Sequence, residues 1–257
     1  MRAIRQHTFG PPSVLTLEPL PDLSPAHLGL VPGGYAEQAV TTPDRLFALD
    51  DRVGAPEAVA AVGTGRTARG VVELEPPAAG DVVLVPSAAG GVGWLLVQAA
   101  RAAGATVVAA ARGEERTALL RSTGADLVVD YGVDGWAAQV REAVGGVSLV
   151  YDGVGGDIGR EALGLCSPGA RFVMFGSSSG TPTAFDSADL IRLGATAGWS
   201  LGPRMQALPG GIPGLAARSL AAVADGAWRP LVTTFPLIEA ARAHAALEAR
   251  RAPARSS

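Results

Sequence analysis

The chain contains no lysine and no asparagine, and Cys166 is the only cysteine among its 257 residues. Without lysine, mechanisms built on a lysine Schiff base or a lysine general base are excluded. A single cysteine excludes a disulfide within the chain and a zinc cluster made of several thiolates. The histidines His7, His27 and His244 are scattered without the spacing of a metal site, so we expect no bound metal.

Strong charge of one sign and long apolar runs are also missing. The formal net charge is −3 with no basic block, which argues against nucleic acid as a partner. No uninterrupted apolar run reaches the roughly 20 residues of a membrane-spanning helix, and Met1–Gln6 does not begin a secretory signal pattern. We therefore expect a cytoplasmic protein with no membrane partner. Hydrophobic residues make up 48% of the chain, enough to bury a full core.

The most informative segment is Val82–Gly93, with the sequence VVLVPSAAGGVG. It predicts a buried strand, a glycine-rich turn and then a helix. Ala88, Gly90 and Gly93 occupy the three positions of the dinucleotide-binding pattern G-x-G-x-x-G, with alanine in the first. Small residues let the backbone approach a pyrophosphate, and the free amides at the start of the helix face its charge. By itself this pattern is a weak signal, because such units also occur without nucleotides.

Apolar strands and amphipathic helices alternate from this segment onward. The pattern predicts strands at 82–85, 106–110, 127–130, 149–152, 171–175 and 195–201. Continuous apolar strands separated by helices indicate a parallel sheet that is covered on both faces. We therefore predict an α/β protein with a doubly wound parallel sheet of the Rossmann type.

Around this sheet the signals are shorter. We expect further strands at Val14–Leu17, Tyr35–Val40 and Leu231–Phe235. We also expect helices over 55–68, 215–224 and 238–250. The predicted domain division is 58–228 for the dinucleotide-binding domain, with 1–57 and 229–257 forming a smaller β-rich domain from both chain ends.

The tip of the second predicted strand bears on which dinucleotide binds. An acidic residue there would bind the ribose 2′-hydroxyl of NAD, but the sequence has Arg112 and, one helical turn later, Arg116. Two guanidinium groups suit a 2′-phosphate, which favours NADPH. In the alternative interpretation Arg116 lies on a solvated helix face beside Glu115. Tyr131, after the third strand, either stacks near the adenosine or caps the sheet.

Two further loops follow predicted strands, at Asp152–Gly156 and Phe175–Gly180. Ligands in this architecture lie at the carboxyl ends of parallel strands. Backbone groups of these loops could hold the nicotinamide half of a dinucleotide, or the loops could simply be tight turns.

Three segments resemble the medium-chain dehydrogenase/reductase superfamily, specifically its zinc-independent quinone oxidoreductase branch. They are Met1–Leu17, Gly33–Leu49 and Ser87–Gly93, the last matching the branch's A-A-G-G-V-G signature. Members of this branch reduce quinones or α,β-unsaturated carbonyls by hydride transfer from NADPH. They often dimerise through the last strand of the sheet, so the resemblance implies NADPH, a small-molecule substrate and a homodimer.

The resemblance also implies roles for individual residues. Those near the pyrophosphate would be Ala88, Ala89, Gly90, Gly91, Val92 and Gly93. Those around the 2′-phosphate would be Arg112, Arg116 and Tyr131. Those near the nicotinamide would be Thr64, Val154, Phe175, Gly176 and Ser177. The proton would come from water or from a nearby hydroxyl, for which Tyr35 is the candidate.

The chain departs from this family between its opening strands and Gly33. Relatives carry several dozen more residues there, which build most of the GroES-like catalytic domain and supply an asparagine, whereas here only Pro19–Pro32 intervenes. We expect a reduced catalytic domain and an open cofactor cleft. Two functions therefore stay open: an NADPH-dependent quinone or enone reductase, and a degenerate relative that binds a ligand or templates a cyclisation without redox chemistry.

Overall fold

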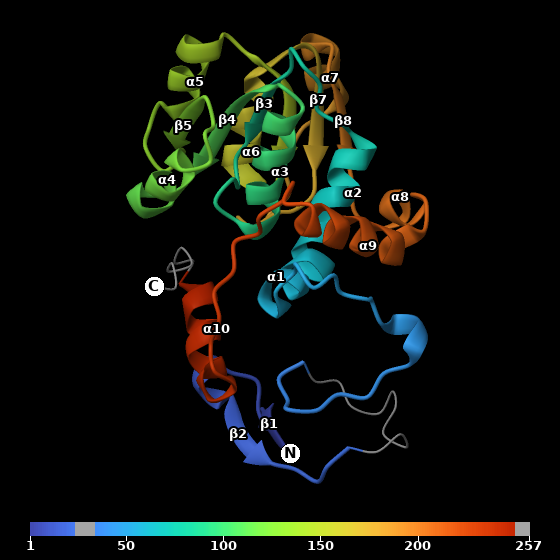
Figure 1. The fold of residues 1–257 in the computed structure, drawn as a ribbon. Coiled ribbons are helices and arrows are strands. Elements are labelled where there is room, and N and C mark those ends of the chain that lie inside the picture. Colours follow the sequence, from blue (N-terminus) through green and yellow to red (C-terminus); the bar gives the residue numbers. More distant parts are fainter. Residues whose placement is uncertain (24–33, 250–257) are drawn as a thin grey trace. The chain divides into compact units, whose positions relative to one another are not determined.

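The computed structural model describes residues 1–23 and 34–249 and divides into two compact units (Figure 1). Unit 1 combines Met1–Ala48 with Val232–Ser257, and unit 2 is Leu49–Leu231. The sequence-based division placed the corresponding boundaries after residue 57 and before residue 229. Most of the Pro19–Pro32 segment and the end of the predicted last helix lie outside the described residues.

Unit 2 is built on a six-stranded parallel sheet with the order β5-β4-β3-β6-β7-β8. Its strands are β3 (Val82–Val85), β4 (Thr106–Ala111), β5 (Leu127–Asp130), β6 (Val147–Asp152), β7 (Cys166–Met174) and β8 (Thr196–Trp199). The predicted doubly wound fold is confirmed. Strand β3 pairs with β4 on one side and with β6 on the other. The strand order reverses at this point, and ligands bind at such reversals.

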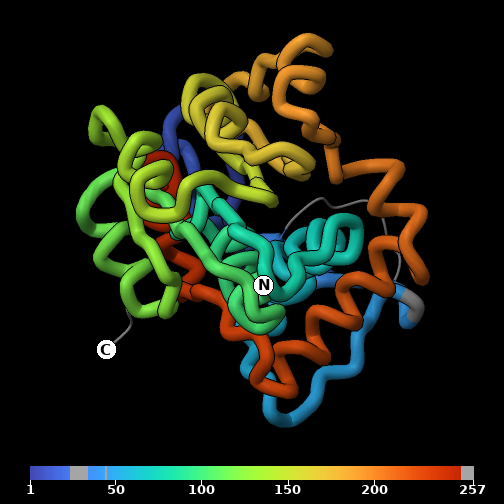
Figure 2. The backbone as a smooth tube through the Cα atoms, turned by 90° about the horizontal axis from the view of Figure 1, so that it is seen from above, coloured from blue at the N-terminus to red at the C-terminus, as the bar shows by residue number. Residues whose placement is uncertain are grey.

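Helices cover both faces of this sheet, as the view from above shows (Figure 2). The first face carries α2 (Arg66–Leu74), α3 (Gly91–Ala102), α4 (Glu114–Arg121) and α9 (Gly211–Ala224). The second carries α5 (Trp136–Val144), α6 (Gly156–Gly164) and α7 (Ser187–Leu193). Side chains alternate along a strand, so Val83 belongs to the same core cluster as Leu95 of α3, while Leu84 belongs to the cluster on the other face with Phe172. In the described part of the chain no helix is long and apolar enough to cross a membrane.

The helix predicted over 55–68 is longer than expected and is interrupted. It consists of α1 (Ala55–Ala60), the π-helical turn η4 (Ala61–Gly65) and α2. A Cβ atom on Gly65 would lie 2.1 Å from Oγ of Ser219 on α9, so the glycine permits close packing of the two elements. The π turn carries Thr64, one of the predicted site residues.

Unit 1 contains a two-stranded antiparallel sheet of β1 (Arg2–Arg5) and β2 (Thr16–Pro19). Its other elements are the short turns η1 (Pro12–Val14), η3 (Pro43–Arg45) and η5 (Leu237–Glu239), and the helix α10 (Ala240–Glu248). Tyr35 lies beside β1, because the amide of Ile4 donates to its carbonyl oxygen over 2.8 Å.

Three strand predictions in this part of the chain need correction. The strand expected at 14–17 begins at Thr16, and the strand expected at 35–40 is reduced to one bridge between Ala36 and Ala3. The segment Leu231–Phe235 is not a strand. Its β-branched residues favour extended backbone, but a strand also needs a neighbour to complete its hydrogen-bond ladder, and the described structure gives this segment none.

Candidate functional site

The glycine turn lies at the carboxyl end of β3, where the strand order reverses. The amide of Gly90 donates to the Ser87 carbonyl over 2.9 Å, and the amide of Ala88 donates to Ala110 of β4 over 3.1 Å. A Cβ atom on Gly93 would lie only 2.0 Å from the Ser87 carbonyl oxygen. The absence of a side chain therefore lets α3 begin directly against the turn.

The first turn of α3 offers free amides to a ligand. Gly90 is its N-cap and provides no side-chain cap, and the amide of Trp94 is the first to donate back along the helix, to the Gly90 carbonyl over 2.8 Å. The amides of residues 91–93 have no partner within the helix, as in every helix N-terminus. Because Gly90 and Gly91 are exposed, a pyrophosphate can approach this positive end of the helix.

Thr64 borders the same turn. A Cβ atom on Gly91 would lie 2.8 Å from the Thr64 methyl carbon Cγ2. The π turn η4 thus brings Thr64 to the start of α3, although the two are far apart in the sequence. The structure thus places Thr64 against the glycine turn.

The loop after β6 is ordered by a buried carboxylate. Oδ1 of Asp152 accepts the amides of Val154 and Gly155 over 2.9 and 3.0 Å, and its Oδ2 accepts the Thr183 hydroxyl over 2.5 Å. Asp152 therefore shapes the loop and does not face a ligand. Sequence reasoning missed this function, although a strand-terminal Asp followed by glycine is typical of such a turn.

The loops after β6 and β7 meet the glycine turn at Gly153. A Cβ atom there would lie 2.6 Å from Ser87 Oγ and 2.7 Å from the Phe175 ring. Of the predicted nicotinamide neighbours, Val154 and Phe175 are buried. Gly176 and Ser177 are partly exposed at the rim. The carboxyl ends of β3, β6 and β7 thus form one continuous wall.

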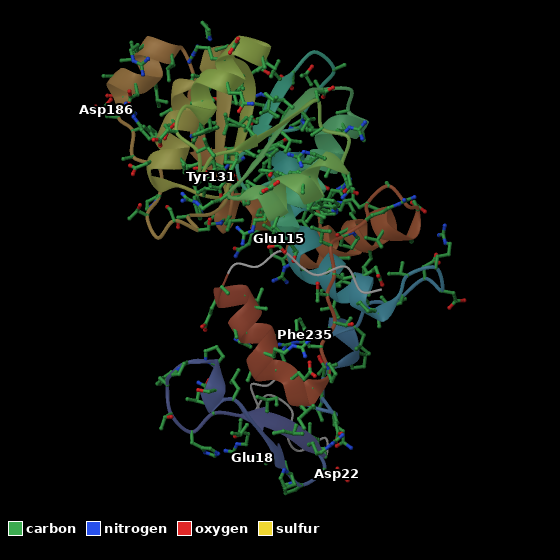
Figure 3. The ribbon with its side chains drawn as sticks, turned by 90° about the vertical axis from the view of Figure 1, so that its left-hand side faces the viewer. Glu18, Asp22, Glu115, Tyr131, Asp186 and Phe235 are labelled. Atoms are coloured by element: carbon green, nitrogen blue, oxygen red, sulfur yellow. The ribbon has the colours of Figure 1, made fainter. Side chains whose placement is uncertain are left out.

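The predicted 2′-phosphate residues lie at the tips of β4 and β5. The exposed Arg112 places its guanidinium carbon 5.5 Å from the Tyr131 ring centroid, and Tyr131 also meets Trp136 edge to face at 6.4 Å. Arg116 is half-buried in the first turns of α4. Tyr131 and Glu115 are labelled in Figure 3.

Acidic residues occupy the beginning of α4 itself. Glu114 and Glu115 lie in its first turn, where carboxylates interact favourably with the helix dipole and compete with any other anion. These carboxylates therefore weaken the attraction of the α4 N-terminus for a phosphate.

Tyr35 lies in unit 1 and forms a pair that the sequence did not predict. Its hydroxyl is 3.0 Å from Nε2 of His244 on α10, and the two rings meet edge to face with centroids 5.5 Å apart. Tyr35 is 48% exposed. The pair presents a phenol that an imidazole can reprotonate.

Neither a reactive thiol nor a metal site is found among the described residues. Cys166 is buried, and burial raises the pKa of its thiol to about 12, which makes it a poor nucleophile. Across residues 1–23 and 34–249, no three His, Cys, Asp or Glu side chains gather in a way that could hold a metal ion.

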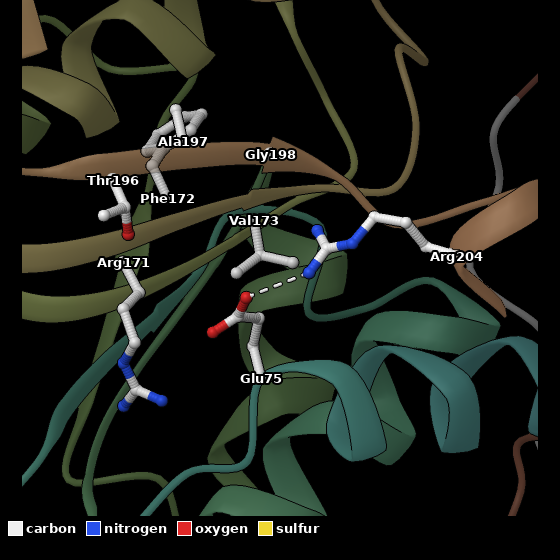
Figure 4. A pocket seen from close by; sticks show the side chains of 8 residues that line it. All are labelled: Glu75, Arg171, Phe172, Val173, Thr196, Ala197, Gly198 and Arg204. Atoms are coloured by element: carbon white, nitrogen blue, oxygen red, sulfur yellow. Dashed lines mark hydrogen bonds and ion pairs between the residues drawn. The ribbon is translucent and has the colours of Figure 1, made fainter. Parts of the chain in front are cut away.

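A separate cavity of about 140 Å³ is lined by residues of β7 and β8 together with Glu75 and Arg204 (Figure 4). Its charged groups are already paired: Arg204 contacts Glu75 at 3.3 Å, and Arg171 contacts Asp81 at 2.7 Å. No residue of the glycine turn or of the loops after β6 and β7 lines the cavity, so we do not assign the nucleotide to it.

The sequence is also similar to known proteins. A family model described as "Zinc-binding dehydrogenase" matches residues 91–210. A quinone oxidoreductase of Pseudomonas aeruginosa is 31% identical over 233 residues, which are 85% of this chain and 69% of that relative. A 2-haloacrylate reductase of a Burkholderia species is 36% identical over 116 residues, which are 44% of this chain and 33% of that relative.

Solved structures resemble the whole fold. A mycobacterial protein complexed with NADPH superposes with a TM-score of 0.81 at 26% identity, covering 98% of this chain and 97% of its own. The Escherichia coli quinone oxidoreductase complexed with NADPH gives a TM-score of 0.79 at 20% identity, covering 98% and 97%. At that identity the second comparison supports the fold alone.

Proposed function

The chain belongs to the quinone oxidoreductase branch of the medium-chain dehydrogenase/reductase superfamily, and from this premise we propose that it is an NADPH-dependent oxidoreductase. Its acceptor is a quinone or an α,β-unsaturated carbonyl compound. The observation that carries the proposal is the exposed first turn of α3 packed against Ser87 at the reversal of strand order.

In this proposal, different parts of the site bind different parts of the dinucleotide. The amides of residues 91–93 hold the pyrophosphate, and Ala88 and Ala89 allow its close approach. Arg112, Arg116 and Tyr131 hold the 2′-phosphate. The residues beside the nicotinamide are Thr64, Val154, Phe175, Gly176 and Ser177. The bound dinucleotide supplies the hydride, and the protein's contribution is to hold the acceptor carbon over the ring.

We assign the proton to Tyr35. Its hydroxyl is exposed, and the adjacent His244 nitrogen can reprotonate it after each turnover. Reduction of an enone adds a hydride to the β-carbon and a proton to the resulting enolate. In this proposal the phenol of Tyr35 supplies that proton. His244, once it has taken a proton from solvent, gives that proton to the Tyr35 phenolate.

The proposal also covers the cellular location and the oligomeric state. We propose a cytoplasmic homodimer that pairs through β8, which lies at an edge of the sheet and carries the 44% exposed Trp199. An unpaired strand edge with an exposed aromatic residue is suited to such pairing. Light scattering should give the mass of two chains.

Turnover tests this function. NADPH consumption is followed with simple quinones and enones, with enzyme lacking substrate as the blank. Oxidation that depends on both substrate and protein supports the reductase. Binding of NADPH without turnover of either substrate class would contradict the reductase and favour the non-redox alternative. The small size of the catalytic domain expected from the sequence also favours that alternative.

A further inference from the structure

One carboxylate connects the two loops that carry the proposed 2′-phosphate residues. Asp130 ends β5 and is the register partner of Ala111, the last residue of β4. Its Oδ1 atom accepts the amide of Gly113 over 2.9 Å and the amide of Gly132 over 2.7 Å. A single oxygen thereby joins the residues next to Arg112 and Tyr131.

The residues around this oxygen are closely packed. A Cβ atom on Gly132 would lie 2.9 Å from Oδ1 of Asp130 and 3.1 Å from Cγ of Arg112. The Arg112 stem therefore packs against the Gly132 backbone, and its guanidinium comes to lie over the Tyr131 ring. The tip of β5 fixes where this exposed cation sits.

We propose that Asp130 is a positioning residue that determines the preference of this protein for a 2′-phosphorylated adenosine. It acts by holding the 112–113 and 131–132 loops together, so that the Arg112 guanidinium is already placed when the phosphate arrives. An exposed arginine that is free to rotate loses side-chain entropy on binding, and one that is held in advance loses less. The inference rests on the proposed function.

The carboxylate also has an electrostatic cost. A negative group at the tip of β5 repels a phosphate, and accepting two amides partly offsets this repulsion. The acceptor oxygen and the charge can therefore be separated by mutation. Asp130→Asn keeps an acceptor and removes the charge, whereas Asp130→Ala removes both.

Asp126 is the matched control. It lies just before β5, and its Oδ2 accepts the amide of Val107 of β4 over 2.8 Å. It thus joins the same two strands at the opposite edge of the sheet from the proposed phosphate. Asp126→Ala removes a comparable bond and should destabilise the fold without changing the choice of nucleotide.

The test is calorimetric titration of wild type and variants with NADPH and with NADH, together with thermal unfolding. In Asp130→Ala we expect the Kd for NADPH to rise about tenfold and that for NADH less than twofold. We expect Asp130→Asn to bind NADPH at least as tightly as wild type, and Asp126→Ala to keep the wild-type ratio of the two Kd values.

Gly132→Ala provides a second route should Asp130→Ala fold poorly. It lies in an exposed loop, and its new Cβ atom would crowd both Asp130 Oδ1 at 2.9 Å and Arg112 Cγ at 3.1 Å. It disturbs the same arrangement without removing the carboxylate, so it should also lower the NADPH preference. A wild-type ratio in Asp130→Ala and Gly132→Ala would overturn the inference, as would a loss in Asp130→Asn equal to that in Asp130→Ala. If wild type binds neither nucleotide, the proposed function itself fails.

Discussion

Gly93→Ala tests the contact on which the nucleotide site is built. The new Cβ atom would lie 2.0 Å from the Ser87 carbonyl oxygen, 2.6 Å from its carbonyl carbon and 2.9 Å from Cα of Ala88. All three atoms belong to the backbone, so no side chain can rotate away. Real Cβ contacts essentially never fall below 3.0 Å, so the start of α3 must move about 1 Å from the turn.

Two opposing effects set the magnitude. Crowding of this kind destabilises by about 1–3 kcal/mol, while alanine is favoured over glycine inside a helix by about 1 kcal/mol. Because the clash is with backbone, we take the upper end of the crowding cost, about 3 kcal/mol, and expect a net loss of stability of about 2 kcal/mol. A displacement of about 1 Å also spoils the alignment of the first-turn amides, and we expect the Kd for NADPH to rise at least about tenfold.

Gly164→Ala is the matched control for this experiment. Gly164 is also helical, at the end of α6, and a Cβ atom there would meet nothing within 4 Å. We expect it to gain about 0.5–1 kcal/mol. Urea unfolding measures the stability of both variants, and calorimetric titration measures their Kd for NADPH. Equal stability of the two variants, with NADPH binding unchanged in Gly93→Ala, would refute the reasoning.

Four further outcomes are expected. Arg112→Ala should raise the Kd for NADPH about tenfold by calorimetry and leave NADH unchanged; an equal loss for both would contradict its assignment to the 2′-phosphate. Burial raises the pKa of Glu73, but hydrogen bonds from Arg218 and Arg69 outweigh it and hold that pKa below its ordinary 4.5. The stabilisation is therefore present above that pH and is lost as pH falls, so Glu73→Gln should lower the unfolding free energy by about 1 kcal/mol at neutral pH and by less under acid conditions. Cys166, with its thiol pKa raised to about 12, should react with a thiol reagent at mildly alkaline pH only after urea is added; rapid labelling of folded protein would show that it is accessible. Tyr35→Phe should lower kcat for an enone with the Kd for NADPH unchanged, and an unaltered kcat would remove Tyr35 as the proton donor.

The parallel sheet could be predicted because its strands are continuous apolar runs. Val82–Val85 was predicted to the residue, since a strand buried on both faces has apolar residues at every position. Leu127–Asp130 was also predicted to the residue, from its run of three apolar residues, although it is an edge strand. The glycine turn was visible for a similar local reason: the close approach of Ser87 to Gly93 involves residues only six positions apart.

Features that depend on distant residues could not be predicted. The π turn at Ala61–Gly65 is tied to Ser219 of α9, and nothing in the local pattern of 55–68 indicates it. Leu231–Phe235 has strand-forming residues but no neighbouring strand in the described structure, so its local preference is overridden. The Asp130 carboxylate joins two loops separated by a whole helix, and only the fold brings them together.

The most direct test of the account is a calorimetric titration of the wild-type protein with NADPH, followed by NADH over the same range. The account predicts one NADPH site per chain and weaker binding of NADH. Absence of binding at about millimolar NADPH, a concentration at which even weak specific sites fill, would contradict it, because the first-turn amides of α3 would then hold no dinucleotide.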